Sequence, residues 1–182
     1  MYTLVTLSVV ALLFRLLWLK NPKTSPNQCT LQAYKDTINA YIAKTSQTVS
    51  GDFKTWIDKT LSYLGQDAKI FEIGSGPGRD ALYMQSKGFA VECSDATPGF
   101  VNVCQEKGLN ARMFNILTDE LTNSYDMIFA GAVFLHMSQE ELQQALKKIH
   151  AHLHPQAILS FSVKKGVGHE WECGKLGNNP RY

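Results

Sequence analysis

The segment FEIGSGPGRD, residues 71–80, sets the architecture of this chain. A short apolar run leads into three glycines spaced two apart, and a helical pattern follows from position 79. Glycine permits backbone angles that other residues avoid, and it lets a ligand approach the main chain closely. A strand that passes through such a turn into a helix is typical of nucleotide-binding α/β folds. The segment therefore predicts a ligand-binding turn, and a tight turn without a ligand is the alternative.

Strands and helices alternate on both sides of this turn. Short apolar runs predict strands at residues 69–73, 89–94, 110–114, 125–130 and 157–163. Periodic runs predict helices at 79–87, at 98–107 after an N-cap at Thr97, and after a capping box of Ser138 and Glu141, with two further amphipathic helices ahead of the first strand. This order predicts an α/β fold with a Rossmann-like, doubly wound and mostly parallel sheet, which binds ligands at the carboxyl ends of its strands.

The acidic residues near the turn favour a cationic ligand. Glu72 comes just before the glycines, and Asp95 closes the second strand about twenty residues further on. A carboxylate at the first position suits an ammonium or a sulfonium group and would repel a diphosphate. A carboxylate at the second position accepts hydrogen bonds from ribose hydroxyls. The dinucleotide fingerprint would also require glycine at position 79, which is Arg79, so a nicotinamide-dependent oxidoreductase is disfavoured.

The acidic-x-Gly-x-Gly-x-Gly pattern resembles motif I of the class I S-adenosylmethionine-dependent methyltransferases. The segment 95–98 resembles the acidic-x-Ser-Pro turn of that family, and residues 162–166 with Arg181 and Tyr182 resemble its bacterial small-molecule branch. The resemblance implies S-adenosylmethionine as cofactor and methyl transfer to a small-molecule acceptor as activity. It implies these cofactor-binding residues: Glu72, Gly74, Ser75, Gly76, Gly78, Asp95, Ala96, Asn115, Ile116 and Gly131.

One histidine is placed to take part in the chemistry. An oxygen or nitrogen acceptor that loses a proton needs a nearby base, and His136 follows the fourth strand directly. The alternative is a histidine that packs at the strand end without transferring a proton. Tyr34 and Tyr41 lie on the first helix, over the expected site or in its core. His150 and His154 share a helical spacing, but no third ligand accompanies them, so no metal site is predicted.

The composition argues against nucleic acid as a partner and indicates the redox state of the cysteines. The chain has 182 residues and a formal net charge of +2, with basic and acidic residues interspersed. Nucleic acid is therefore not indicated as a partner, because phosphate neutralisation requires a clustered basic surface. The cysteines lie far apart and form no CxxC pair, so we expect reduced thiols and a cytoplasmic location.

The two ends of the chain depart from the pattern of a single domain. Residues 2–19 are mostly apolar with Arg15 as their only charge, which predicts a membrane anchor that leaves the rest on the cytoplasmic face, or else a leader of no function. We expect a hydrophobic segment at 1–20, a polar linker at 21–30 and the methyltransferase domain at 31–182.

The expected domain is incomplete. The family fold has seven strands and this sequence predicts only five, so we expect a C-terminally truncated domain without the last two strands. Two hypotheses follow, an enzyme that methylates a small molecule and a non-catalytic remnant that binds the cofactor or a partner.

Overall fold

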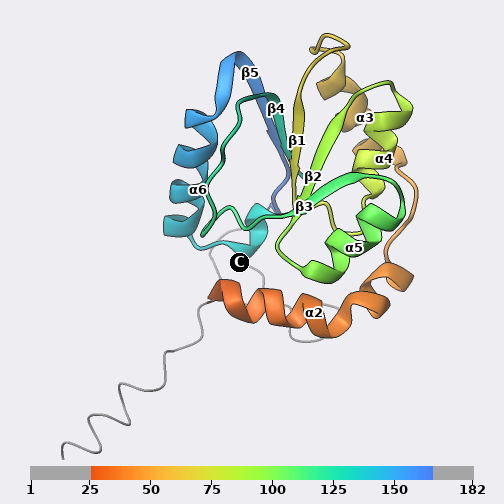
Figure 1. Cartoon of the computed structure of the whole chain (residues 1–182), viewed down its shortest axis with the longest axis vertical. Helices are drawn as coiled ribbons and strands as arrows, with labels where there is room; N and C mark the ends of the chain where they lie inside the picture. The colour runs from red at the N-terminus through yellow and green to blue at the C-terminus, as the bar shows by residue number, and fades with distance from the viewer. Residues whose placement is uncertain (1–25, 166–182) are drawn as a thin grey trace, which may run out of the picture.

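The computed structural model describes residues 26–165, which form one parallel five-stranded sheet in the order β3-β2-β1-β4-β5 (Figure 1). The strands are β1 Ile70–Ile73, β2 Val91–Asp95, β3 Asn110–Met113, β4 Tyr125–Ala130 and β5 Leu153–Phe161. The predicted alternation of strands and helices and the parallel sheet are confirmed. The hydrophobic segment 2–19, Cys173 and the Arg181–Tyr182 segment lie outside the described residues.

Helices cover both faces of the sheet, as expected for a doubly wound fold. They are α2 Pro26–Lys44, α3 Gly51–Leu61, α4 Arg79–Ser86, α5 Pro98–Glu106, the short 3-10 helix η1 Phe134–His136, and α6 Gln139–Ala151. In Figure 1, α6 lies on one side of the sheet, α3, α4 and α5 lie on the other, and α2 crosses one end of it. Within residues 26–165, no helix is both long enough and apolar enough to span a bilayer.

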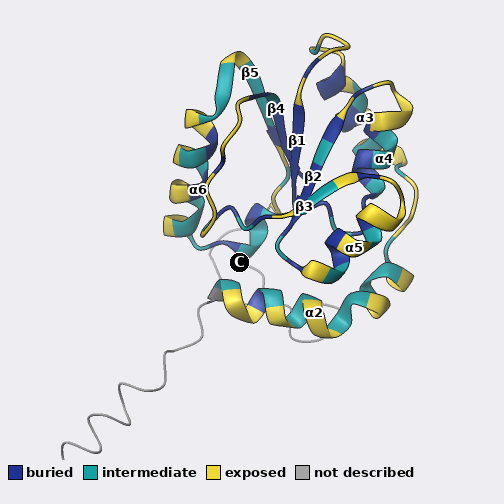
Figure 2. Cartoon of the chain, in the orientation of Figure 1, coloured by how far each residue is buried: buried dark blue, intermediate teal, exposed yellow. Residues whose placement is uncertain are grey.

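The sheet separates two apolar cores, because neighbouring residues of a strand point to opposite faces. Ile70 packs with Met84 of α4 and Ile57 of α3, whereas Phe71 packs with Ile149 of α6 on the other face. Figure 2 shows the central strands buried along their length and the outer helix faces exposed. This layering holds the carboxyl ends of β1, β2 and β4 together at one edge.

Two predicted boundaries were wrong by four residues or more. The linker expected at 21–30 is in part helical, because α2 begins at Pro26, and proline is compatible with the first turn of a helix. The fifth strand begins at Leu153 instead of 157, and Leu153 pairs with Tyr125 of β4. A register shift lies between Tyr125 and Met127, and Gln156 has a φ of 67°, so the first part of β5 pairs irregularly with β4.

Hydrogen bonds at the N-termini of α6 and α5 test the two helix starts that the sequence predicts. The capping box is confirmed, since the Glu141 amide donates to Ser138 Oγ at 3.2 Å and the Ser138 amide donates to Glu141 Oε2 at 2.8 Å. Thr97 does occupy the N-cap of α5, but its side chain makes no capping hydrogen bond. Its amide instead donates to Asp95 Oδ1 at 2.8 Å, which ties the end of β2 to the start of α5.

The glycine turn needs glycine for two separate reasons. Gly74, Gly76 and Gly78 all have positive φ angles, of 69°, 52° and 81°. A Cβ at position 78 would also lie 2.4 Å from Leu109 Cδ1 and 3.0 Å from Cys104 Sγ. The third glycine therefore lets α4 start close against the neighbouring β2-α5-β3 unit.

We expect Gly78→Ala to lower the free energy of unfolding by about 2 kcal/mol, because left-handed strain adds to overpacking. Gly108→Ala is the matched control, since Gly108 has a φ of 78° but a Cβ there would meet nothing within 4 Å. The free energy of unfolding of this control should fall by only about 1 kcal/mol, from backbone strain alone. Urea unfolding of both variants measures the difference, and equal losses would show that packing at position 78 contributes nothing.

Candidate active site

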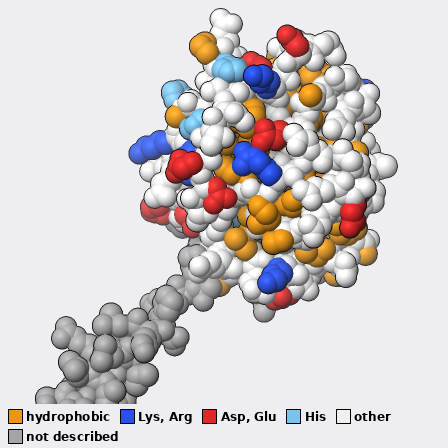
Figure 3. Space-filling view, in the orientation of Figure 1, with side chains coloured by type: hydrophobic (Ala, Val, Ile, Leu, Met, Phe, Trp, Pro, Cys, Tyr) orange, Lys and Arg blue, Asp and Glu red, His pale blue; other side chains and the backbone are white. Residues whose placement is uncertain are grey.

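A cavity of about 200 Å³ opens at the carboxyl ends of β1, β2 and β4, beneath helix α2. Gly74 follows β1, Asp95 ends β2 and Gly131 follows β4, while Tyr34 and Tyr41 reach the cavity from α2. This is the edge of a parallel α/β sheet at which ligands bind. On the face shown in Figure 3, basic side chains lie among acidic ones and form no continuous basic surface.

Most of the predicted cofactor residues line this cavity. They are Gly74, Gly76, Asp95, Ala96, Asn115, Ile116 and Gly131. Glu72, Ser75 and Gly78 do not line it. Ser75 Oγ instead accepts from the Ser94 amide at 3.2 Å, and Gly78 packs against Cys104, so these two residues shape the turn from behind.

Asp95 joins the second strand to the glycine turn. Its Oδ2 accepts from the Gly76 amide at 2.9 Å, and its Oδ1 accepts from the Thr97 amide. Burial raises the pKa of this carboxyl, and the backbone hydrogen bonds from Thr97 and Gly76 act against that rise. Because Asp95 also lines the cavity, its carboxylate is the kind of acceptor that a ribose diol requires.

Glu72 carries a buried oxygen without a partner. The residue is 2% exposed, and its Oε2 makes no hydrogen bond within the described residues. Burial, followed by the nearby charge of Asp80, raises the pKa of Glu72 to about 8. An orphaned carboxyl oxygen of this kind fits a cationic group, so the residues present are compatible with a sulfonium cofactor that carries an ammonium group.

We expect Glu72→Gln to stabilise the chain at alkaline pH. The folded-state pKa lies above the unfolded value, so the folded chain holds a proton that the unfolded chain has lost, and wild-type stability falls as the pH rises from about 4.5 to about 8. Glutamine cannot ionise and avoids this loss, which is on the order of a few kcal/mol above pH 8. Urea unfolding at pH 5 and pH 9 measures it.

Glu106→Gln is the control for this experiment, because Glu106 is an exposed carboxyl at the end of α5. The Glu106→Gln variant should have the same free energy of unfolding as the wild type at both pH values. A Glu72→Gln variant that gains nothing at pH 9 relative to pH 5 would contradict the buried, proton-holding state of Glu72.

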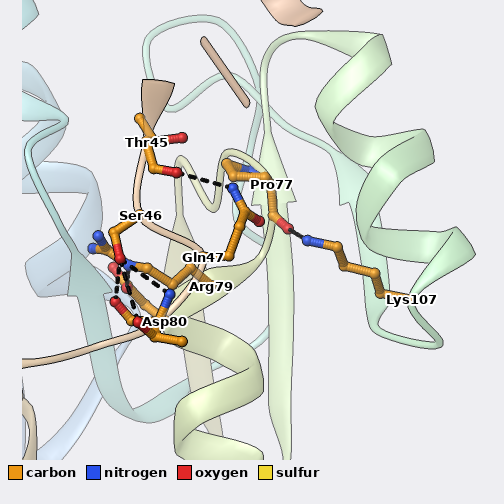
Figure 4. A network of polar contacts seen from close by, with 8 residues as sticks. Thr45, Ser46, Gln47, Pro77, Arg79, Asp80 and Lys107 are labelled. Carbon is orange, nitrogen blue, oxygen red and sulfur yellow. Dashed lines mark hydrogen bonds and ion pairs between the residues drawn. The ribbon is translucent and has the colours of Figure 1, made fainter. Parts of the chain in front are cut away.

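Asp80 is a second buried carboxyl, which was not predicted from the sequence. Arg79 Nε donates to Asp80 Oδ1 at 2.6 Å (Figure 4). The Arg79 guanidinium also lies 4.8 Å from the centre of the Phe53 ring. On the other side of the turn, Lys107 Nζ donates to the Pro77 carbonyl at 2.6 Å. The signal in the sequence was the Arg-Asp pair directly after the last glycine.

Asn115 lies at the far end of the cavity and is already engaged. Its Oδ1 accepts from the Leu117 amide at 3.1 Å, and its Nδ2 donates to Asn27 Oδ1 of α2 at 2.8 Å. The oxygen keeps one lone pair for a ligand. Asn115 therefore also fastens α2 to the end of the sheet.

His136 forms a pair that was not predicted from the sequence. Its Nε2 lies 2.9 Å from the hydroxyl of Tyr34, which is 102 positions away in the sequence. Both residues line the cavity, and Tyr34 packs edge-on against Tyr41 and Phe100 at centroid distances of 5.4 and 6.0 Å. The aromatic residues of α2 thus complete the site next to a histidine.

The other histidines among residues 26–165 lie elsewhere. His154 Nδ1 contacts Asp126 Oδ1 at 2.9 Å, and His152 Nδ1 contacts the carbonyl of Lys148. His150 is exposed on α6. Among residues 26–165, no group of three or more His, Cys, Asp or Glu side chains is placed to hold a metal ion.

Comparisons with known proteins agree with this architecture. Residues 70–156 match the family described as "Methyltransferase domain". A phosphoethanolamine N-methyltransferase of Plasmodium falciparum is 31% identical over 103 residues, which cover 53% of this chain and 39% of that protein. The probable S-adenosyl-L-methionine-dependent methyltransferase TehB of Haemophilus influenzae is 24% identical over 132 residues, or 69% of this chain and 44% of that protein.

A solved structure shares the fold. The TehB-like S-adenosylmethionine-dependent methyltransferase of Corynebacterium glutamicum superimposes with a TM-score of 0.57 at 18% identity, over 84% of this chain and 80% of its own. The chain spans less than half the length of the two relatives named above. Together with the strand order and the glycine turn, these matches show that residues 70–156 form a methyltransferase domain with the fold of the class I S-adenosylmethionine-dependent methyltransferases.

Proposed function

We propose that this protein transfers a methyl group from S-adenosylmethionine to a small-molecule acceptor held between the glycine turn and α2. The main support for the proposal is that one cavity is lined both by Asp95 with Gly74 and Gly76 and by the Tyr34–His136 pair. The first set is suited to a nucleoside-containing cofactor, and the second is suited to moving a proton.

The cofactor-binding half follows the order of the strands. Asp95 of β2 would accept hydrogen bonds from the ribose hydroxyls, and Asn115 with Ile116, after β3, would contact the adenine. Ala96 lines the cavity between these two positions, and Gly74 and Gly76 leave the main chain open to close approach. When bound, S-adenosylmethionine supplies an electrophilic methyl group.

The residues of this chain contribute positioning and proton transfer. Displacement at a methyl group with a good leaving group depends mostly on alignment of the two reactants. An amine or alcohol acceptor must also lose a proton, and we propose that His136 accepts it. The Tyr34 hydroxyl, at 2.9 Å from His136 Nε2, would hold the imidazole in place on the cavity side of α2.

Isothermal titration of the full chain with S-adenosylmethionine, and separately with NAD, tests the cofactor assignment. Saturable binding of the methyl donor without binding of NAD is the expected result. Binding of NAD alone would replace the proposal with a nicotinamide-dependent oxidoreductase. A folded chain that binds neither compound would overturn the cofactor assignment altogether.

A second candidate is a protein that binds the cofactor without catalysis. It is favoured by the exposure of Phe161 at the end of β5 and of Val163 just after it, at 41% and 54%, because apolar side chains in such a position are commonly covered. This alternative predicts saturable binding of S-adenosylmethionine without formation of S-adenosylhomocysteine when a small-molecule extract of the source cells is added. Formation of S-adenosylhomocysteine that depends on the extract would exclude it.

A further inference from the structure

The segment between β4 and α6 holds a strained residue beside the cavity. Ala132 has a φ of 59°, which lies in the left-handed region that is unfavourable for a residue with a Cβ. Ala132 lines the cavity together with its neighbours Gly131 and Val133. Strain of this kind persists only where the surrounding structure holds the backbone in place. The contacts of Ala132 therefore decide how the chain passes from β4 into the active site.

The Ser162 side chain, just beyond β5, makes one of these contacts. The Ala132 amide donates to Ser162 Oγ at 2.9 Å. The Ser162 amide donates to the Ala130 carbonyl at 3.2 Å, which continues the pairing of β5 with β4 and places the Ser162 hydroxyl opposite the strained residue. Ser162 is not among the residues that line the cavity, so any effect it has on the site acts through Ala132.

The backbone that follows Ala132 leads directly into η1 and His136. Val133 packs against the glycine turn, since a Cβ at position 74 would lie 2.5 Å from Val133 Cγ2. The His136 amide donates to the Val133 carbonyl at 3.1 Å, which joins η1 to this segment. A rotation of the backbone at Ala132 would therefore shift η1 and carry His136 out of its place in the cavity.

We propose that Ser162 is a positioning residue for methyl transfer: its hydroxyl holds Ala132 in the left-handed conformation, which sets the place of His136. The inference rests on the proposed function, in which His136 accepts the proton of the acceptor. The Tyr34 hydroxyl contacts the imidazole from α2, and Ser162 fixes from β5 the backbone that carries it. Loss of the Ser162 hydroxyl should lower the rate more than the affinity for the cofactor, because the rate depends on alignment.

Ser162→Ala removes the hydrogen bond. We expect the rate of S-adenosylhomocysteine formation with a panel of small amines and alcohols to fall about tenfold, while the affinity for S-adenosylmethionine changes by less than about threefold. Ser162→Thr keeps a hydroxyl and should restore most of the rate. Ser86→Ala is the matched control and should keep the wild-type rate, because the exposed Ser86 hydroxyl donates to the Tyr83 carbonyl at 2.7 Å on α4, away from the cavity.

A glycine at position 132 separates positioning from a general loosening of the loop. Glycine adopts the left-handed conformation without strain, so the backbone then needs less support from Ser162. Removal of the Ser162 hydroxyl should therefore slow the Ala132→Gly variant by less than about threefold, against about tenfold in the wild type. Equal losses in the two backgrounds would overturn the proposal, since a hydroxyl that merely stabilises the loop acts alike in both.

The nitrogen chemical shifts of the His136 imidazole, measured by NMR on the full chain, give a readout that needs no acceptor. We expect them to change in Ser162→Ala and to return in Ser162→Thr. Unchanged His136 resonances in Ser162→Ala would overturn the role of Ser162 and leave the proposed function intact. Changed resonances in a chain that forms no S-adenosylhomocysteine with any acceptor would support the placement of His136 by Ser162 and contradict the proposed function.

Discussion

Replacing His136 with asparagine is expected to slow methyl transfer by about 100-fold or more, because a positioned general base contributes roughly 100- to 10,000-fold to proton-transfer steps. Asparagine is close in size and cannot accept the acceptor's proton as imidazole does. The rate of S-adenosylhomocysteine formation with a panel of small amines and alcohols measures the effect. Affinity for S-adenosylmethionine should change by less than about threefold, since the proposed role concerns the acceptor.

Two companion variants separate proton transfer from packing. Tyr34→Phe removes the hydroxyl that lies 2.9 Å from His136 Nε2 and keeps the ring, so we expect a smaller loss of about tenfold. His150→Asn changes an exposed histidine of α6 and should have no effect. Turnover of His136→Asn at the wild-type rate would remove His136 from the mechanism and leave it as a packing residue.

Replacing Asp95 with alanine is expected to weaken S-adenosylmethionine binding by about 100-fold, because hydrogen bonds to a charged group contribute about 1.5–3 kcal/mol each. The same carboxylate also accepts from the amides of Gly76 and Thr97, so its loss loosens the glycine turn in addition. Isothermal titration measures the affinity, and circular dichroism establishes that the variant is folded.

Asp95→Asn refines this result. Asparagine keeps one acceptor oxygen for the turn and loses the charge, so we expect an intermediate loss of about tenfold. Asp67→Ala, an exposed aspartate before β1, serves as the control and should bind as the wild type does. Wild-type affinity in a folded Asp95→Ala protein would show that the cofactor lies elsewhere in the cavity.

The sequence predicted the fold well because the relevant signals are local. Each strand is a short apolar run, each helix has its own periodicity, and the glycine turn occupies consecutive positions. The strand β4 was predicted with its observed bounds, and the capping box of α6 was confirmed. The errors arose where tertiary contact overrides local preference. Pairing with β4 extended β5 back to Leu153, and packing over the sheet extended α2 to Pro26.

The candidate site was only partly predictable. Asp95 ends β2, Asn115 comes shortly after β3 and Gly131 directly follows β4. Because strand ends of a parallel sheet meet at one edge, their assembly followed from the order of elements. The site also contains Asn27, Tyr34 and Tyr41 of α2. The periodicity of a helical sequence shows which face of the helix is apolar, but not which surface that face covers.

The sequence by itself therefore determined the parallel α/β architecture, the glycine turn and the carboxylates that suit a cationic nucleoside cofactor. Only the tertiary structure decided that Tyr34 meets His136 and that Asp80 lies behind Gly131. It also decided that Glu72 Oε2 is buried without a hydrogen-bond partner among residues 26–165. The physical reason is that local patterns encode which face of an element is buried. The partner that buries it is selected by the packing of elements distant in sequence, and burial in turn sets the charge state of the groups trapped there.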